Sequence, residues 1–251
     1  MKNRFNFTRK NPKTKKIENA GYMEIRDAGE SGVQLFIYGD IVSSSWDKWS
    51  SEDTCPQDIS DFMRQIDANA DLTVYINSGG GDVFAGIGIH SILSRHSGKI
   101  TGVVDGIAAS IASVILMACD EIVMSDGAQI MIHKPLTIAA GNADDFTKIV
   151  EILNKCQESI TAIYMNHVND DVTEDDITGM INAETWMDAE YASMVFSGVT
   201  MSGTPAAAAC VSWMMDSYKN PPEGIKTKSV EDAAAEVAAE EAALLEEMEL
   251  L

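Results

Sequence analysis

Two residues in one short stretch of the chain could act together as a nucleophile and its base. Ser110 lies in the run Ala-Ala-Ser-Ile-Ala, after an apolar segment with a glycine near its end, where a serine can begin a helix. Backbone N–H groups at such a position favour a developing anion. His133 follows the apolar residues Ile130–Ile132 and precedes Pro135, which cannot donate to a strand and so ends it. A histidine at a strand end is placed as a general base would be.

Each of these residues also has an ordinary structural explanation. Ser110 could be one of several serines in small-residue turns, and His133 could be a hydrogen-bonded histidine at the rim of a sheet. The surrounding sequence is therefore needed to distinguish a catalytic role of these two residues from a purely structural one.

A glycine turn precedes the serine in the chain. Gly79, Gly80 and Gly81 follow an apolar run and come directly before Asp82, which can cap the helical pattern that starts there. The turn is a poor match to phosphate-binding loops, because no GxxxxGK[ST] motif is present and no acidic residue ends a second strand in dinucleotide register. It is better explained as a backbone N–H donor for an oxyanion, beside which a peptide backbone can approach closely.

The elements that position these residues predict an α/β fold with a largely parallel sheet. Short, near-continuous apolar runs are typical of strands covered on both faces, and helical spacing separates them. We expect strands at residues 23–27, 33–41, 72–77, 100–106, 121–125 and 129–133. We expect helices at residues 58–68, 83–96, 110–118, 142–168 and 172–181, with residues 184–199 closing the globular part.

The composition is that of one sizeable core, since 45% of the 251 residues are hydrophobic. No apolar run is long enough to span a bilayer, and the basic N-terminus lacks the apolar region of a signal peptide. The widely spaced Cys55, Cys119, Cys156 and Cys210 form no CxxC pair, so we expect buried, reduced thiols and neither disulfides nor a zinc site. These features predict a cytosolic protein without a metal or another cofactor.

The charge is strongly negative and unevenly placed. A net charge of -21 should repel nucleic acid and anionic lipid, so we expect neither as a partner. Residues 1–21 are a basic segment without apolar periodicity and are expected to form a flexible, disordered arm. Residues 202–251 form an Ala/Glu-rich acidic tail, in which Val230, Val237, Leu244 and Leu251 recur every seven residues. This spacing fits a weak coiled coil, a single fraying helix or a merely solubilising tail.

Taken together and in order, four blocks of the sequence resemble the ClpP family of serine peptidases. They are INSGGGDVFAG, DGIAASIAS, MIHKP and ETWMDAEYA, and the resemblance extends from about Tyr22 to Val199. It is closest to the ClpP-like head maturation (prohead) proteases of tailed bacteriophages. The resemblance implies a crotonase-like spiral of ββα repeats over residues 22–201, with residues 142–168 as the long handle helix by which two rings interlock. Residues 136–145 would line a groove that binds extended peptides by β-augmentation.

The resemblance also assigns the site residue by residue. Ser110 matches the nucleophile and His133 matches the general base. The backbone N–H groups of Gly81 and Ile111 match the oxyanion-hole donors. No metal or other cofactor belongs to this chemistry.

The third member of the triad departs from the family's pattern. The usual aspartate lies two residues before an aromatic residue, and here Trp186 marks that aromatic and Glu184 takes the position. A glutamate can orient an imidazole and stabilise its charged form, as an aspartate does. Asp188 is the other candidate.

The predicted function is that of a serine endopeptidase that cleaves scaffold or capsid proteins, and its own tail as a further candidate, during phage head maturation. It would form homo-oligomeric rings and work in the host cytoplasm or inside the immature capsid. Three alternatives stay open: a housekeeping ClpP-type subunit working with an ATPase, a Ser–Lys protease with Lys134 as base, and an inactive scaffold-like relative. The absence of a membrane anchor argues against the second.

Overall fold

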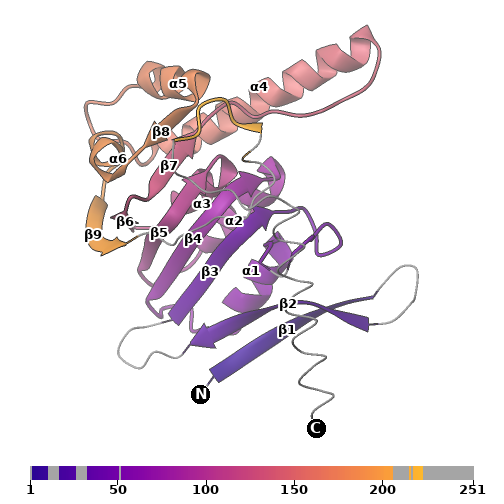
Figure 1. The fold of residues 1–251 in the computed structure, drawn as a ribbon, viewed down its shortest axis with the longest axis vertical. Helices are drawn as coiled ribbons and strands as arrows, with labels where there is room; N and C mark the ends of the chain where they lie inside the picture. The colour runs from indigo at the N-terminus through magenta and orange to yellow at the C-terminus, as the bar shows by residue number, and fades with distance from the viewer. Residues whose placement is uncertain are drawn as a thin grey trace.

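The structure is a computed structural model that describes residues 2–10, 17–26, 33–50, 52–205, 215 and 217–222. Its main sheet has seven strands: β3 Val33–Ile41, β4 Leu72–Gly81, β5 Ile100–Ala109, β6 Glu121–Asp126, β7 Gln129–Ile132, β8 Thr185–Met187 and β9 Val199–Pro205. The helices of the described residues are α1 Pro56–Met63, α2 Val83–Leu93, α3 Ile111–Leu116, α4 Ala143–Met165, α5 Glu174–Ala183 and α6 Ala189–Val195. Figure 1 shows the arrangement.

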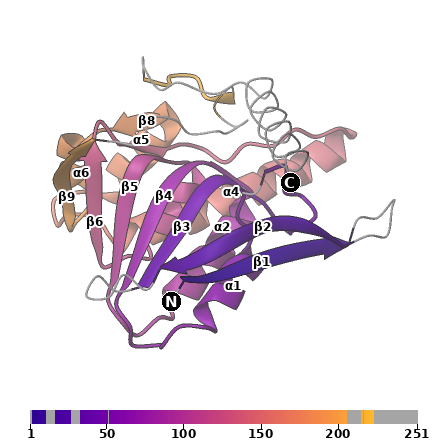
Figure 2. The same ribbon diagram turned by 60° about the horizontal axis from the view of Figure 1, so that its bottom comes forward.

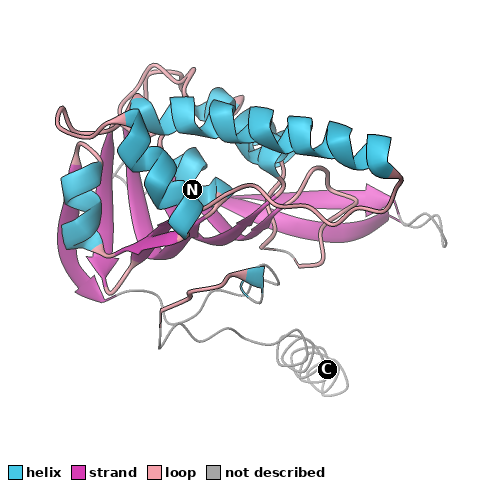
Figure 3. Cartoon of the chain, turned by 90° about the horizontal axis from the view of Figure 1, so that it is seen from above, coloured by secondary structure: helices cyan, strands magenta, loops and turns pink. Residues whose placement is uncertain are grey.

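The main sheet is parallel except at one edge. Strands β3, β4, β5, β6 and β9 are neighbours in this order, and every pair among them is parallel. β7 runs parallel to the end of β5, and β8 pairs with β7 in the antiparallel sense. Helices follow the strands along the chain and lie on one side of the sheet (Figure 3). The predicted α/β fold with a largely parallel sheet is confirmed.

The strands bury one face more completely than the other. Along β4 and β5, fully buried residues alternate with half-buried ones as far as Ile76 and Val104. The buried set, which includes Leu35, Ile37 and Val74, packs with α2 and α3 in the main hydrophobic core. These strands were expected to be covered on both faces. The described helices cover one face, and the side chains on the other face of β4 and β5 are half-buried.

The helix α4 confirms the predicted long helix, although it ends three residues early. Asn142 caps it by accepting the N–H groups of Asp144 and Asp145 at 2.9 and 3.1 Å. Its second half is anchored, since Cys156 and other residues of that half are buried. Its first half extends beyond the sheet and leaves apolar side chains such as Phe146, Val150 and Ile152 exposed (Figure 1).

The basic N-terminal segment is not without regular structure, contrary to expectation. Strands β1 Lys2–Lys10 and β2 Ile17–Arg26 pair as an antiparallel hairpin beside β3 (Figure 2). Their register sets Arg4 opposite Glu24 and Arg9 opposite Glu18.

Two of the sequence predictions fall where the structure gives no description. The heptad positions from Val230 to Leu251 lie outside the described residues, and so does Cys210. The other three cysteines, Cys55, Cys119 and Cys156, are free and buried, as predicted.

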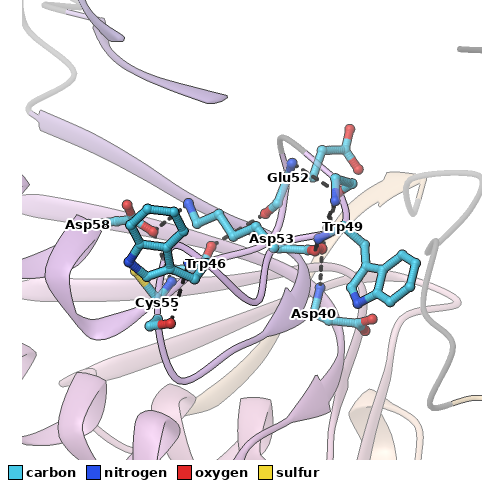
Figure 4. A network of polar contacts seen from close by, with 11 residues as sticks. Asp40, Trp46, Trp49, Glu52, Asp53, Cys55 and Asp58 are labelled. Carbon is cyan, nitrogen blue, oxygen red and sulfur yellow. Dashed lines mark hydrogen bonds and ion pairs between the residues drawn. The ribbon is translucent and has the colours of Figure 1, made fainter. Parts of the chain in front are cut away.

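The polar loop between β3 and α1 is fixed by buried charges (Figure 4). Lys48 Nζ lies 2.6 Å from Asp58 Oδ2, and both side chains are only 5% exposed. The Asp53 carboxylate accepts the backbone N–H groups of Asp40 and Trp49 at 3.1 and 2.8 Å. These contacts tie the loop to the end of β3 and the start of α1, next to the glycine turn that ends β4.

Candidate active site

Ser110 occupies a tight turn between β5 and α3. Its backbone has φ 55° and ψ -126°, a conformation that residues other than glycine rarely adopt. The Ser110 N–H donates to Met131 O at 2.9 Å, which ties the turn to β7. The Ser113 hydroxyl lies 2.6 Å from Ser110 O and 2.8 Å from the Tyr164 hydroxyl, so α3 and α4 support the same turn.

His133 follows β7 and contacts the serine directly. Its Nε2 lies 2.8 Å from Ser110 Oγ, within hydrogen-bond distance. The two residues meet because β7 runs parallel to the end of β5, so both side chains emerge at the same edge of the sheet. Burial lowers the pKa of His133 and outweighs the nearby charge of Glu184, which acts to raise it. The imidazole therefore favours its neutral form, which can accept a proton.

The glycine turn approaches Ser110 more closely than any side chain would allow. A Cβ on Gly80 would lie 2.8 Å from both Ala109 O and Ser110 Cβ, and 3.4 Å from Ile111 N. A Cβ on Gly81 would lie 2.0 Å from Ile41 O, and its φ of 144° also requires glycine. The Gly80 N–H donates to Ser78 Oγ at 3.2 Å. The Ile111 N–H is at the first position of α3, where helical donors lack an intrahelical acceptor.

Glu184 lies near the histidine but makes no hydrogen bond with it. It ends α5 in the left-handed conformation, with φ 54°. Its Oε1 accepts the backbone N–H groups of Lys219 and Asn220 at 2.6 and 2.7 Å. Asp188, the other candidate, caps α6 by accepting the Tyr191 N–H at 2.9 Å. The described contacts thus bring Ser110 and His133 together. The carboxylates of Glu184 and Asp188 instead accept backbone N–H groups of other residues.

Tyr218 is a site residue that the sequence analysis missed. Its hydroxyl donates to Gly79 O, and its ring meets His133 edge-on at 5.1 Å between centroids. It also contacts Trp186, at 5.9 Å between ring centroids. The sequence signal for this contact is weak, because Tyr218 is one aromatic residue in a segment whose composition differs from that of the domain.

Lys134 is not placed to act as the base. Its side chain is exposed, and it makes no hydrogen bond to Ser110, whose hydroxyl contacts His133. This arrangement disfavours the Ser–Lys alternative. Among the described residues, no group of His, Cys, Asp or Glu side chains could hold a metal ion. No helix of the described ranges has both the length and the apolar character needed to cross a bilayer.

Comparison with known proteins identifies the family to which the chain belongs. The sequence profile of the Clp protease family matches residues 44–195, which is more than half of the chain and includes Ser110, His133 and Glu184. The chain therefore belongs to the Clp protease family.

Three similar relatives are each named ATP-dependent Clp protease proteolytic subunit. The one from Bacteroides thetaiotaomicron is 31% identical over 133 residues, which cover 52% of this chain and 60% of the relative. Two from strains of Bacteroides fragilis are each 30% identical over 133 residues, which cover 63% and 60% of those relatives. The chain thus spans about 60% of the length of these relatives. The family-level resemblance is confirmed, whereas the closer likeness to prohead proteases is not tested by these relatives.

Proposed function

We propose that the chain is a serine endopeptidase of the ClpP type, with Ser110 as nucleophile and His133 as general base. The observation that carries the proposal is the 2.8 Å contact between Ser110 Oγ and His133 Nε2 at a strained strand-to-helix turn. Strained backbone conformations persist only where the surroundings hold them, and they cluster at active sites. Here the Met131 carbonyl and the Ser113 hydroxyl hold the turn.

The proposed reaction has two halves. Ser110 Oγ attacks the peptide carbonyl carbon while His133 Nε2 takes the hydroxyl proton, which forms a tetrahedral oxyanion. The C–N bond then breaks, and His133 returns the proton to the leaving amine. Water attacks the resulting acyl ester by the same route, which releases the carboxylic acid and restores Ser110.

Backbone N–H groups would stabilise the oxyanion. Gly81 and Ile111 are the donors that the family resemblance assigns. A Cβ on Gly80 would lie 3.4 Å from Ile111 N, so the glycine turn lies beside the start of α3, as this assignment requires. Glu184 would orient the imidazole as a positioning residue when its carboxylate turns from Lys219 and Asn220 towards His133. Asp188 is less suited to this task, because its carboxylate caps α6.

The substrates would be polypeptides. They would be cleaved either together with an ATPase, as in housekeeping degradation, or during phage head maturation, and these two cases are called the two settings here. The names of the Bacteroides relatives favour a ClpP-type subunit that forms homo-oligomeric rings and works with an ATPase. The quoted sequence blocks and the acidic segment 202–251 instead support cleavage of scaffold or capsid proteins during phage head maturation. The family membership favours the first setting. Cleavage during phage head maturation is the more specific hypothesis, and it would place the protein in the host cytoplasm or the immature capsid.

The proposed chemistry is tested by labelling and hydrolysis. Wild type should react with a fluorophosphonate probe at Ser110, located by mass spectrometry, and should cleave a fluorogenic peptide. Ser110→Ala and His133→Ala should each lower kcat by about 1,000-fold or more. Ser159→Ala is the matched control, because this serine lies exposed on α4 and bonds only to Lys155 O. Labelling that persists in Ser110→Ala, or wild type that neither labels nor cleaves, would refute the proposal.

The setting is tested by substrate choice. Purified wild type and Ser110→Ala are incubated with an unfolded protein, with and without a Clp ATPase and ATP, and with a phage scaffold protein alone. ATP-stimulated degradation supports the first setting. Discrete cuts in the scaffold protein, absent with Ser110→Ala, support the second.

A further inference from the structure

We propose that Met215 and residues 217–222, together called the latch here, dock on the Ser110–His133 site and hold it in a less active state. The latch is described at residue 215 and over residues 217–222, and it lies on the face of the sheet opposite to the helices (Figure 3). The inference rests on the proposed peptidase function and concerns the regulation of the same site.

The first argument concerns the carboxylate of Glu184. Both backbone N–H groups that it accepts, from Lys219 and Asn220, belong to the latch. Hydrogen bonds to a charged acceptor are among the stronger ones in proteins. Since no hydrogen bond joins Glu184 to His133, the docked latch retains the carboxylate that would otherwise orient the imidazole. A serine–histidine pair without this support is a much weaker catalyst.

The second argument concerns the space beside His133. Tyr218 places its ring edge-on against the imidazole and donates its hydroxyl to Gly79 O. Its side chain and that of Met215 are buried together against Ile107 and Met131. A peptide approaching the glycine turn would meet Tyr218 there, and the carbonyl of Gly79 is already paired.

The third argument is electrostatic. The attack by Ser110 turns His133 into a cation, so any positive charge nearby opposes the step. Lys219 of the latch is such a charge, and it adds to burial in lowering the pKa of His133. Release of the latch would remove this charge and free the opposing negative charge of Glu184.

The contacts also indicate that docking is reversible. Lys219 and Asn220 are exposed, so their hydrogen bonds to Glu184 compete with water. The buried Nε1 of Trp186, beside Tyr218, has no hydrogen-bond partner among the described residues, which weakens the docked arrangement. Segments whose hydrogen bonds are exposed to solvent open at a lower free-energy cost than the core, although Met215 and Tyr218 must leave their buried cluster when the latch undocks. Any change that favours the undocked population would then raise activity.

The experiment removes one N–H donor from the latch of the full chain. Asn220→Pro deletes the backbone N–H that donates to Glu184, whereas the matched control Asn220→Ala keeps it. The rate constant for fluorophosphonate labelling of Ser110 is measured, together with hydrogen exchange of the latch amides. We expect Asn220→Pro to raise the rate by about tenfold and to lose latch protection, since a bond to a charged group is worth roughly that factor or more. Asn220→Ala should stay within about twofold of wild type.

A second variant guards against a local distortion by proline. Tyr218→Phe removes only the hydroxyl that donates to Gly79 O, and it should also raise the labelling rate, by a smaller factor. Thermal denaturation shows whether each variant remains folded.

The possible results of these experiments distinguish a failure of the latch proposal from a failure of the proposed peptidase function. If wild type labels at Ser110 and both latch variants label no faster, or more slowly, the latch is overturned while the peptidase function stands. Latch amides that already exchange freely in wild type would overturn it as well. If no protein of the set labels at Ser110, the proposed function fails and the latch fails with it.

Discussion

The hydrogen bond between Ser113 and Tyr164 allows a prediction about stability that does not depend on the proposed function. Both side chains are almost completely buried, at 0% and 1% exposure. The Ser113 hydroxyl also lies 2.6 Å from Ser110 O and 3.1 Å from Met131 O. One hydroxyl thus joins α3, α4, β7 and the Ser110 turn, so its loss should affect both stability and site geometry.

The expected magnitudes follow from which groups each variant leaves unpaired. Ser113→Ala removes a net contribution of roughly 1 kcal/mol and also leaves the buried Tyr164 hydroxyl without its partner, which costs roughly 1–3 kcal/mol more. Tyr164→Phe removes that hydroxyl but leaves Ser113 bonded to Ser110 O, so it should cost only about 1 kcal/mol. The double variant has no unpaired hydroxyl, so its loss should fall short of the two single losses combined by about 1–2 kcal/mol.

The assay is urea unfolding of wild type, both single variants and the double variant, followed by circular dichroism. Ser159→Ala on the exposed face of α4 controls for the loss of a serine hydroxyl and should leave the midpoint unchanged. Ser113→Ala should also slow labelling of Ser110 more than Tyr164→Phe does. Single losses that add up to the double loss within about 0.5 kcal/mol would refute the reasoning.

Three further predictions concern the site and the loop beside it. Because burial lowers the pKa of His133, the rate of Ser110 labelling should fall with decreasing pH only below the pH at which an unperturbed imidazole titrates. Gly80→Ala should abolish labelling, measured by mass spectrometry, because its Cβ would lie 2.8 Å from Ser110 Cβ at a φ of 103°. Lys48→Met should lower the free energy of unfolding by about 3–5 kcal/mol in urea, since it removes the cation paired with the buried carboxylate of Asp58 and leaves, among the described residues, only the Cys55 N–H donating to it.

Controls for these predictions use similar residues in other surroundings. Gly127→Ala also places a Cβ at a positive φ, of 81°, but meets nothing within 4 Å, so labelling should survive. Lys99→Met breaks the exposed pair with Glu121 and should leave the unfolding midpoint almost unchanged. A pH profile that follows an ordinary imidazole, or equal effects of the two lysine substitutions, would contradict the stated causes.

The sequence alone predicted the elements whose signals are local. The apolar runs and helical spacing gave the order of strands and helices, and Asp82 caps α2 as expected, accepting the Ala85 N–H at 2.7 Å. The pairing of β1 with β2 was not predicted, because residues 1–21 show no apolar periodicity in the sequence, and only residues 23–27 were expected to form a strand there. The difference in burial between the two faces of β4 and β5 was not predicted, because an apolar run does not indicate which face the helices cover.

The candidate site was likewise predicted only as far as its sequence signals are local. Residue types and spacing suggested Ser110 and His133 separately, but their 2.8 Å contact depends on β7 running beside the end of β5, which no local pattern encodes. The family resemblance supplied that link. The contact of Tyr218 with His133 joins residues 85 positions apart, across a change in composition, and Tyr218 lies outside the blocks that carry the resemblance.

The glutamate at position 184 connects these observations. The family resemblance expects an aspartate there, whose shorter side chain has less reach. Glu184 has one methylene more, and it starts from a left-handed backbone position at the end of α5, beside both His133 and the latch. A longer side chain can reach two sets of donors from one fixed backbone, and in this structure it reaches Lys219 and Asn220. Under the proposed latch, the contacts of Glu184 with Lys219 and Asn220 explain the glutamate, and the serine–histidine contact beside it argues against a loss of activity.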